Sequence, residues 1–183
     1  LLDGGGRAAA EEDDGREDEG EGLHTIGHST TRRRGGTLPP MSERRSARVE
    51  RMTKETRIAV EIDLDGTGRS AIQTPLPFLS HMLDQIARHG LFDLAVAAEG
   101  DVDIDGHHTT EDLGITLGTA VAQALGDKKG LTRYGEATLP MDEALVLCAL
   151  DLSGRTFFVN RVPLPKAKLG TWDVELCPVF FEG

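Results

Sequence analysis

Two adjacent histidines, His107 and His108, stand in the stretch "DVDIDGHHTTEDLGITLGTA" and are soon followed by Glu111. The pattern predicts that they open a helix, in which successive side chains point about 100° apart. Glu111 is the fourth residue after His107 and the third after His108, so its carboxylate neighbours both imidazoles. Imidazole nitrogen and carboxylate oxygen together suit zinc, iron or manganese. Diverging rings favour two separate metal ions over one shared ion.

Two other interpretations of this stretch remain open from the residues alone. Single histidines on helices are more often structural than metal-binding, and spacing does not separate the two roles. A calcium site is the other alternative, because four residues match the start of an EF-hand loop: Asp101, Asp103, Asp105 and Gly106. Against calcium, Asp112 stands where that loop needs a bidentate Glu, and the residues before Asp101 alternate like a strand.

Further histidines lie on an earlier segment, "PFLSHMLDQIARHG", whose apolar spacing predicts a helix from Phe78 to Gly90. His81 is a candidate ligand from a second direction. His89 lies at the end of this helix, where a cation is favoured by the helix dipole. Four of the chain's six histidines therefore lie on or at the start of two predicted helices.

The order of the expected strands and helices predicts an α+β fold: a layer of mixed or antiparallel strands with two helices on one face. Apolar and charged residues alternate over 57–66, which indicates a half-buried strand, and a short strand "AIQT" follows. Residues 91–105 predict one strand or a strand pair, and 137–162 predict two or three strands. The second helix is expected over 109–126, where Gly114 and Gly118 predict the close approach of a neighbouring helix.

Composition limits the classes of protein. A net charge of −11 argues against a nucleic-acid surface, which needs Lys and Arg for phosphates, and no apolar run approaches the length of a membrane span. Residues 1–47 are rich in Gly, Glu and Arg, which predicts a disordered or non-native extension. Its acids disfavour a transit peptide, so a cytoplasmic location is expected, with a plastid as the alternative. Cys148, in "ALVLCALDL", is expected to be a buried free thiol.

Four segments in order carry a resemblance: "PFLSHMLDQIARHGLFDL", "GDVDIDGHHTTEDLGITLG", "GLTRYGEATLPMDEAL" and "DLSGRTFF". From about Arg48 onward the chain resembles the imidazoleglycerol-phosphate dehydratase family of histidine biosynthesis. The resemblance implies a hydro-lyase that converts D-erythro-imidazole glycerol phosphate to imidazole acetol phosphate and water. It also implies a pair of manganese (Mn2+) ions and a homo-oligomeric shell of 24 subunits with shared active sites.

The resemblance assigns roles residue by residue. The implied metal ligands, with the two adjacent histidines serving different ions, are His81, His107, His108 and Glu111. Glu55, in "TKET", matches a glutamate that approaches the substrate, so Glu55 and Glu111 are the candidate catalytic groups. Arg133 and Arg155 match arginines that hold the substrate phosphate, a role that suits the geometry of guanidinium. The chain departs from the family at Ser80, where the family has Asp.

The family is an internal duplication, which implies that 48–160 form the first half-repeat and 161–183 a truncated start of the second. The second half would supply another His-His-x-x-Glu and complete both metal sites. A first half on its own would expose a large apolar face. The alternative function is therefore a truncated, non-catalytic fragment that binds metal or takes part in assembly.

Overall fold

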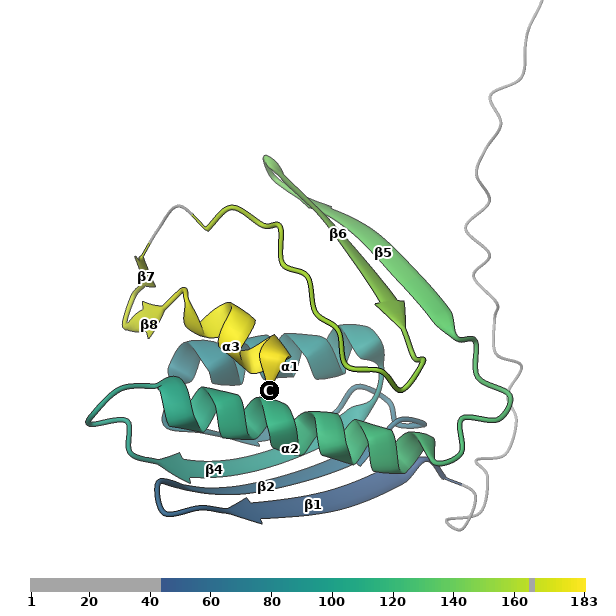
Figure 1. The fold of residues 1–183 in the computed structure, drawn as a ribbon, viewed down its shortest axis with the longest axis horizontal. Helices are drawn as coiled ribbons and strands as arrows, with labels where there is room; N and C mark the ends of the chain where they lie inside the picture. Colours follow the sequence, from purple (N-terminus) through teal and green to yellow (C-terminus); the bar gives the residue numbers. More distant parts are fainter. Residues whose placement is uncertain (1–43, 165–166) are drawn as a thin grey trace, which may run out of the picture. The chain divides into compact units, whose positions relative to one another are not determined.

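The computed structural model describes residues 44–164 and 167–183. Its main sheet has four strands in the order β1-β2-β4-β3 (Figure 1). These strands are β1 (Ser46–Met52), β2 (Thr56–Asp63), β4 (Asp93–Gly100) and β3 (Ser70–Gln73). β2 pairs antiparallel with both β1 and β4, whereas β3 pairs parallel with β4. The predicted α+β class with a mixed sheet is confirmed.

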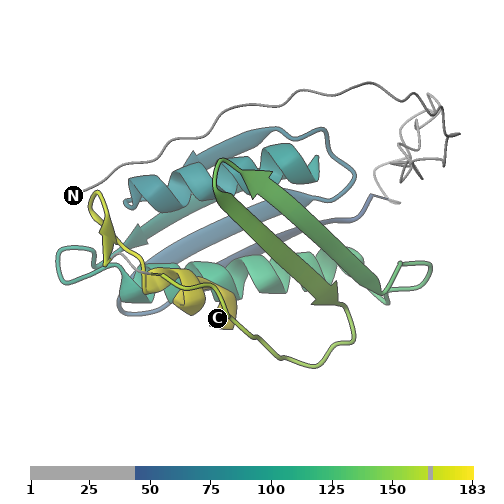
Figure 2. The same ribbon diagram turned by 90° about the horizontal axis from the view of Figure 1, so that it is seen from above.

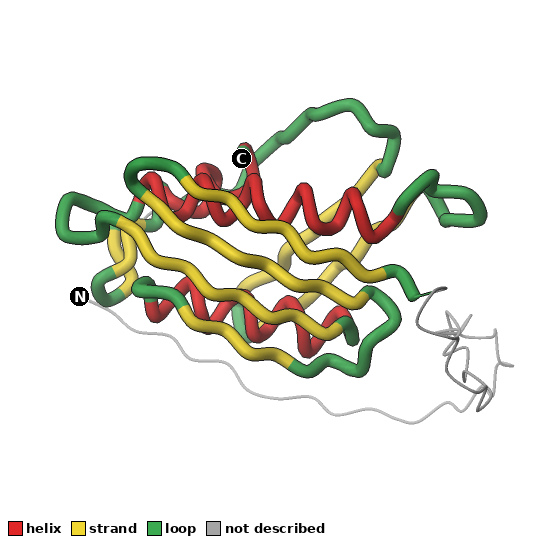
Figure 3. The backbone as a smooth tube through the Cα atoms, turned by 90° about the horizontal axis from the view of Figure 1, so that it is seen from below, coloured by secondary structure: helices red, strands yellow, loops and turns green. Residues whose placement is uncertain are grey.

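Helices α1 (Pro77–Gly90) and α2 (His107–Leu125) cover the same face of this sheet, as the views from above and below show (Figure 2 and Figure 3). The predicted alternation of β2 is confirmed, because Ile58, Val60 and Ile62 are at most 1% exposed and belong to the core. Leu83 of α1 and Leu113 of α2 are fully buried in the same core. Burial of these aliphatic side chains, each worth about 1.5–3 kcal/mol, holds the two helices on the sheet.

A third helix, α3 (Leu176–Glu182), packs on α2. A Cβ atom placed on Gly114 would lie 2.2 Å from the carbonyl oxygen of Phe180 in α3, which confirms the predicted close approach of a helix there. The same prediction is wrong at Gly118, where no described atom lies within 4 Å of such a Cβ. None of the described helices combines the length and the apolar character that a membrane span needs.

Two further strand pairs lie outside the main sheet. Strands β5 (Tyr134–Met141) and β6 (Ala144–Asp151) form an antiparallel hairpin, and β7 (Lys168–Leu169) pairs with β8 (Trp172–Asp173). Every residue of β5 and β6 is exposed. Cys148 is free and exposed on β6, so the prediction of a buried thiol is wrong. The reason is that nothing in the described structure covers either face of this hairpin.

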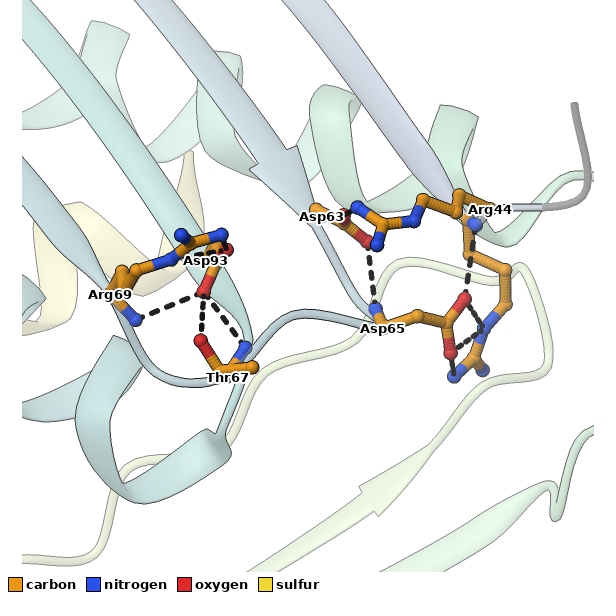
Figure 4. A network of polar contacts seen from close by, with 7 residues as sticks. Arg44, Asp63, Asp65, Thr67, Arg69 and Asp93 are labelled. Atoms are coloured by element: carbon orange, nitrogen blue, oxygen red, sulfur yellow. Dashed lines mark hydrogen bonds and ion pairs between the residues drawn. The ribbon is translucent and has the colours of Figure 1, made fainter. Parts of the chain in front are cut away.

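Order begins earlier than the expected start near Arg48, because β1 already pairs with β2 from Ser46. Arg44 binds Asp63 at 2.9 Å and Arg45 binds Asp65 at 2.7 Å, so arginines also tie the residues just before β1 to the turn after β2 (Figure 4). Residues 1–43, most of the predicted extension 1–47, lie outside the described residues.

Asp93 organises the same end of the sheet (Figure 4). Its carboxylate accepts the backbone N–H groups of Thr67 and Arg69 at 2.8 and 3.0 Å, and the Arg69 guanidinium lies 2.6 Å away. The hydrogen bond from Arg69 holds the pKa of Asp93 well below its usual range, although burial acts in the opposite direction. Asp93 therefore fastens the turn between β2 and β3 to the start of β4.

Asp93→Asn is expected to reduce the free energy of unfolding at neutral pH. It should also make that free energy depend less steeply on pH in the acid range. A carboxyl whose folded pKa is depressed contributes stability above its unfolded value of about 3.9, and this contribution is lost as pH falls through the folded pKa. Urea midpoints measured from pH 7 to pH 2 should therefore converge for wild type and variant at low pH. Glu99→Gln, an exposed carboxylate on the same strand, is the control and should keep the wild-type slope.

Candidate functional site

One end of the main sheet gathers the beginnings of both helices. Thr56, the first residue of β2, pairs with Gly100, the last residue of β4, so the turn before β2 and the loop after β4 meet there. α2 begins at His107 directly after that loop. The start of α1 is close as well, since a Cβ on Gly106 would lie 3.3 Å from Cδ2 of Leu76. The predicted histidine pair is thus placed at the sheet end that also carries Glu55.

The two imidazoles diverge as the spacing predicts. The ring centroids of His107 and His108 are 6.1 Å apart, the rings stand at 83° to each other, and both side chains are exposed. The backbone N–H of His107 donates to Oδ1 of Asp105 at 2.8 Å, which satisfies one of the free N–H groups at the helix start. The histidines therefore project from a fixed helix end toward solvent in two directions.

Asp101 orients one of these rings. Its Oδ2 lies 2.9 Å from Nδ1 of His108, and this hydrogen bond raises the pKa of His108. Burial opposes the rise, while the charges of Asp101, Glu55 and Asp105 add to it. The other oxygen of Asp101, Oδ1, is buried and has no hydrogen-bond partner among the described residues. With Nδ1 engaged, Nε2 of His108 is the nitrogen left to bind a metal.

The site is negative around His108, and Glu55 is part of it. Glu55 is exposed in the turn before β2, and its charge acts on His108 together with those of Asp101 and Asp105. The structure therefore brings the predicted proton-transfer glutamate to a predicted metal ligand. The negative charge near His108 attracts a cation.

The predicted ligand set is not complete within one copy of the described chain. Glu111 and His81 are both exposed, on α2 and α1 respectively. Across residues 44–164 and 167–183, no three His, Cys, Asp or Glu side chains lie close enough together to hold a metal ion. Ser80, which departs from the family's Asp, bonds to Thr74 at 2.9 Å. The donor types fit a metal, but a closed coordination shell needs ligands from elsewhere.

The two predicted phosphate-binding arginines meet at another place. Nε and a terminal nitrogen of Arg133 donate to Asp151 at 2.7 and 3.1 Å. This bond lowers the pKa of Asp151, and the charge of Arg155 contributes to the same shift. Both arginines therefore lie at the open end of the β5–β6 hairpin, which is at the C-terminal end of α2 (Figure 1 and Figure 2). A helix of 19 residues is about 28 Å long, so these arginines and the histidine pair lie at opposite ends of α2.

The calcium interpretation is wrong. The element before Asp101 is strand β4, whereas an EF-hand requires a helix there. Asp112, at the place of the bidentate Glu, is buried and accepts hydrogen bonds from Arg51 and Thr56. The sequence pattern predicted Asp101 only as a calcium ligand, and Asp112 was an argument against calcium. The Thr-x-x-Thr spacing of Thr53 and Thr56 in the turn was the one local signal of a polar network there.

Comparisons with known proteins agree with this arrangement. The sequence profile of the imidazoleglycerol-phosphate dehydratase family matches residues 74–183. The imidazoleglycerol-phosphate dehydratase of Citrifermentans bemidjiense is 60% identical over 139 residues, which are 76% of this chain and 71% of that protein. The Geobacter sulfurreducens dehydratase is 59% identical over 138 residues, which are 75% and 71% of the two chains.

Solved structures show the same fold. The crystal structure of imidazoleglycerol-phosphate dehydratase from Staphylococcus aureus has a TM-score of 0.66 at 36% identity and covers 75% of both chains. The enzyme of Pyrococcus furiosus, in complex with (S)-C348, has a TM-score of 0.58 at 36% identity over 73% of this chain and 70% of that one. The family profile, over residues 74–183, includes both the histidine pair and the hairpin with the arginines. This chain belongs to the imidazoleglycerol-phosphate dehydratase family.

Proposed function

We propose that the chain is a hydro-lyase of histidine biosynthesis that removes water from D-erythro-imidazole glycerol phosphate to give imidazole acetol phosphate. The observation that carries the proposal is the pair of diverging imidazoles, 6.1 Å apart, with Glu55 acting on His108 at the same sheet end. Relatives that are 60% identical and named for this reaction support the substrate class.

The metal ligands in this proposal are His107, His108 and Glu111 of α2 and His81 of α1. Two manganese ions would be bound, one by each of the adjacent histidines, because the rings point apart. Bound manganese would favour the imidazolate form of the substrate ring and so ease the loss of a proton from the neighbouring carbon. The donors required to close each coordination shell come from outside the described residues of one copy.

The chain's own groups would hold the substrate and move its protons. Glu55 is exposed, carries no hydrogen bond on its carboxylate in the described structure, and acts as the general acid or base. Arg133 and Arg155 bind the phosphate. The phosphate then replaces Asp151 as the acceptor for the Arg133 guanidinium. Asp101 keeps the ring of His108 in one orientation through Nδ1.

The homo-oligomeric shell is part of the proposal for a geometric reason. Arginines and histidines lie at or beyond opposite ends of α2, a helix about 28 Å long, and a small phosphorylated imidazole does not span that length. A substrate held by both groups must therefore lie between different copies of the chain. The exposed apolar residues of β5 and β6, among them Leu139, Met141 and Leu145, favour such association. In this proposal the chain binds neither nucleic acid nor a membrane, and it acts in the cytoplasm.

The decisive experiment is turnover of D-erythro-imidazole glycerol phosphate with added manganese, followed by mass spectrometry of the product. Turnover that stops with a chelator, returns with manganese and does not return with calcium supports the hydro-lyase. The second candidate function, a metal-binding or assembly fragment, is favoured by the incomplete ligand set of the described residues. It predicts one weakly bound manganese ion per chain and no turnover.

Asp101→Asn is expected to weaken manganese binding about 10–100-fold, the range typical of partners that orient a ligating histidine. The reason is that an amide no longer fixes the Nδ1 proton of His108 as the carboxylate does. Isothermal titration with manganese measures the change. Asp103→Asn, an exposed carboxylate in the same loop, is the matched control. Equal weakening by both substitutions would show that only the charge of the loop matters.

A further inference from the structure

We infer that Asp112 is a positioning residue that fixes the turn carrying Glu55 relative to the histidines of α2. The inference rests on the role proposed above for Glu55. Asp112 follows Glu111 directly, so the two side chains leave α2 about 100° apart. Glu111 is exposed, whereas Asp112 points inward and is 6% exposed.

Two strong donors from different strands meet at the Asp112 carboxylate. Nε of Arg51, in β1, donates to Oδ1 at 2.7 Å. Oγ1 of Thr56, the first residue of β2, donates to Oδ2 at 2.5 Å, and Thr53 approaches the same oxygen at 3.5 Å. The end of β1 and the beginning of β2 therefore both donate hydrogen bonds to one side chain of α2.

Thr53 passes this attachment on to Glu55. Its hydroxyl oxygen accepts the backbone N–H groups of Glu55 and Thr56 at 3.1 and 2.9 Å, and it lies 3.1 Å from the hydroxyl of Thr56. The backbone N–H of Thr53 donates to the carbonyl of Thr56 at 2.9 Å and closes the turn. The backbone position of Glu55 is thus determined by a network of hydroxyl groups whose common acceptor is Asp112.

The chemistry of the network explains why a carboxylate lies here. A buried charge is costly unless donors compensate it, and burial does raise the pKa of Asp112. The hydrogen bonds from Thr56 and Arg51 outweigh that effect and lower the pKa overall. An ionised carboxylate has two acceptor oxygens and can accept hydrogen bonds from both strands at once. An amide side chain has only one acceptor oxygen, so its NH2 group would point toward Arg51 or Thr56, which are themselves donors. Misplacement of a catalytic group by about 1 Å can cost about 100-fold in rate, so such a fixed turn matters for Glu55.

The test compares Thr56→Val with Thr56→Ser in the full chain with manganese. Thr56→Val keeps the size of the side chain and removes the donor to Asp112, whereas Thr56→Ser retains it. Thr116→Val is the matched control, because the buried hydroxyl of Thr116 donates to the backbone carbonyl of Asp112 and has no link to the turn. Two quantities are measured: amide hydrogen exchange, and kcat separately from KM.

Thr56→Val should speed exchange at the amides of Glu55 and Thr56 about 10-fold or more while the amide of Val60 in the core stays protected. It should lower kcat about 10-fold or more with KM little changed, and add no further loss to Glu55→Gln. Thr56→Ser and Thr116→Val should stay near wild type in both measurements. Asp112→Asn should resemble Thr56→Val.

Three exchange or control results would overturn the inference, and a fourth comes from the kinetics: unchanged exchange at Glu55 in Thr56→Val, equal acceleration at Val60, or the same effects from Thr116→Val would each do so. Faster exchange in the turn with full kcat would also overturn it, because the turn would then not need to be fixed. Absence of turnover in the wild type would remove the proposed function instead. The exchange measurements would still decide whether Asp112 holds the turn.

Discussion

His108→Ala abolishes manganese-dependent turnover, with an expected fall in kcat on the order of 1000-fold or more. His108 is the imidazole that Asp101 orients by a hydrogen bond and whose pKa the charge of Glu55 raises. Its loss therefore removes a proposed metal ligand. The variant should also bind one manganese ion fewer than wild type. Turnover is measured at saturating substrate and manganese, and bound metal is counted by elemental analysis after gel filtration.

His89→Ala is the matched control for this experiment. His89 is an exposed histidine in the last turn of α1 and is not one of the predicted metal ligands. Its removal should leave both turnover and metal content unchanged. If His108→Ala retained turnover with the full complement of manganese, the two-ion site at the histidine pair would be refuted. Loss of turnover with unchanged metal content would assign His108 to proton transfer and contradict its role as ligand.

Gly114→Ala lowers the free energy of unfolding by about 1–3 kcal/mol, the range typical of forcing an extra carbon into a packed site. The new Cβ would lie 2.2 Å from the carbonyl oxygen of Phe180, so α3 must move away from α2. Backbone atoms cannot rotate aside as a flexible side chain can. Equilibrium unfolding in urea, monitored by the fluorescence of the buried Trp172 near α3, measures the change.

Gly118→Ala separates this packing effect from helix propensity. Gly118 lies four residues further on the same helix and has no described atom within 4 Å of a new Cβ. The substitution should therefore stabilise the chain by about 0.5–1 kcal/mol, as expected for replacing glycine by alanine in a helix. A stabilising Gly114→Ala would show that α3 does not pack on α2 in solution. A destabilising Gly118→Ala would indicate that another copy of the chain covers that position.

The local elements of this chain follow from its sequence. Period-two alternation predicted β2, and helical spacing predicted α1 and α2 to within two residues at their starts. The divergence of His107 and His108 also followed from the sequence, because adjacent residues at a helix start leave the axis in different directions whatever the helix packs against. These features depend on backbone geometry and on which side chains are apolar, and both are local properties.

The contacts between distant residues were decided by the tertiary structure alone. Asp101 as the partner of His108 and Asp112 as the acceptor for Thr56, 56 residues earlier, depend on the register of β2 against β4 and on how α2 crosses the sheet. The exposure of Cys148 was mispredicted because a continuous apolar strand has the same sequence whether or not a partner covers it. The separation of the arginines from the histidines likewise follows from the length and direction of α2, which no motif contains. Local periodicity determines what each segment becomes, whereas the pairing of segments determines which side chains share a site.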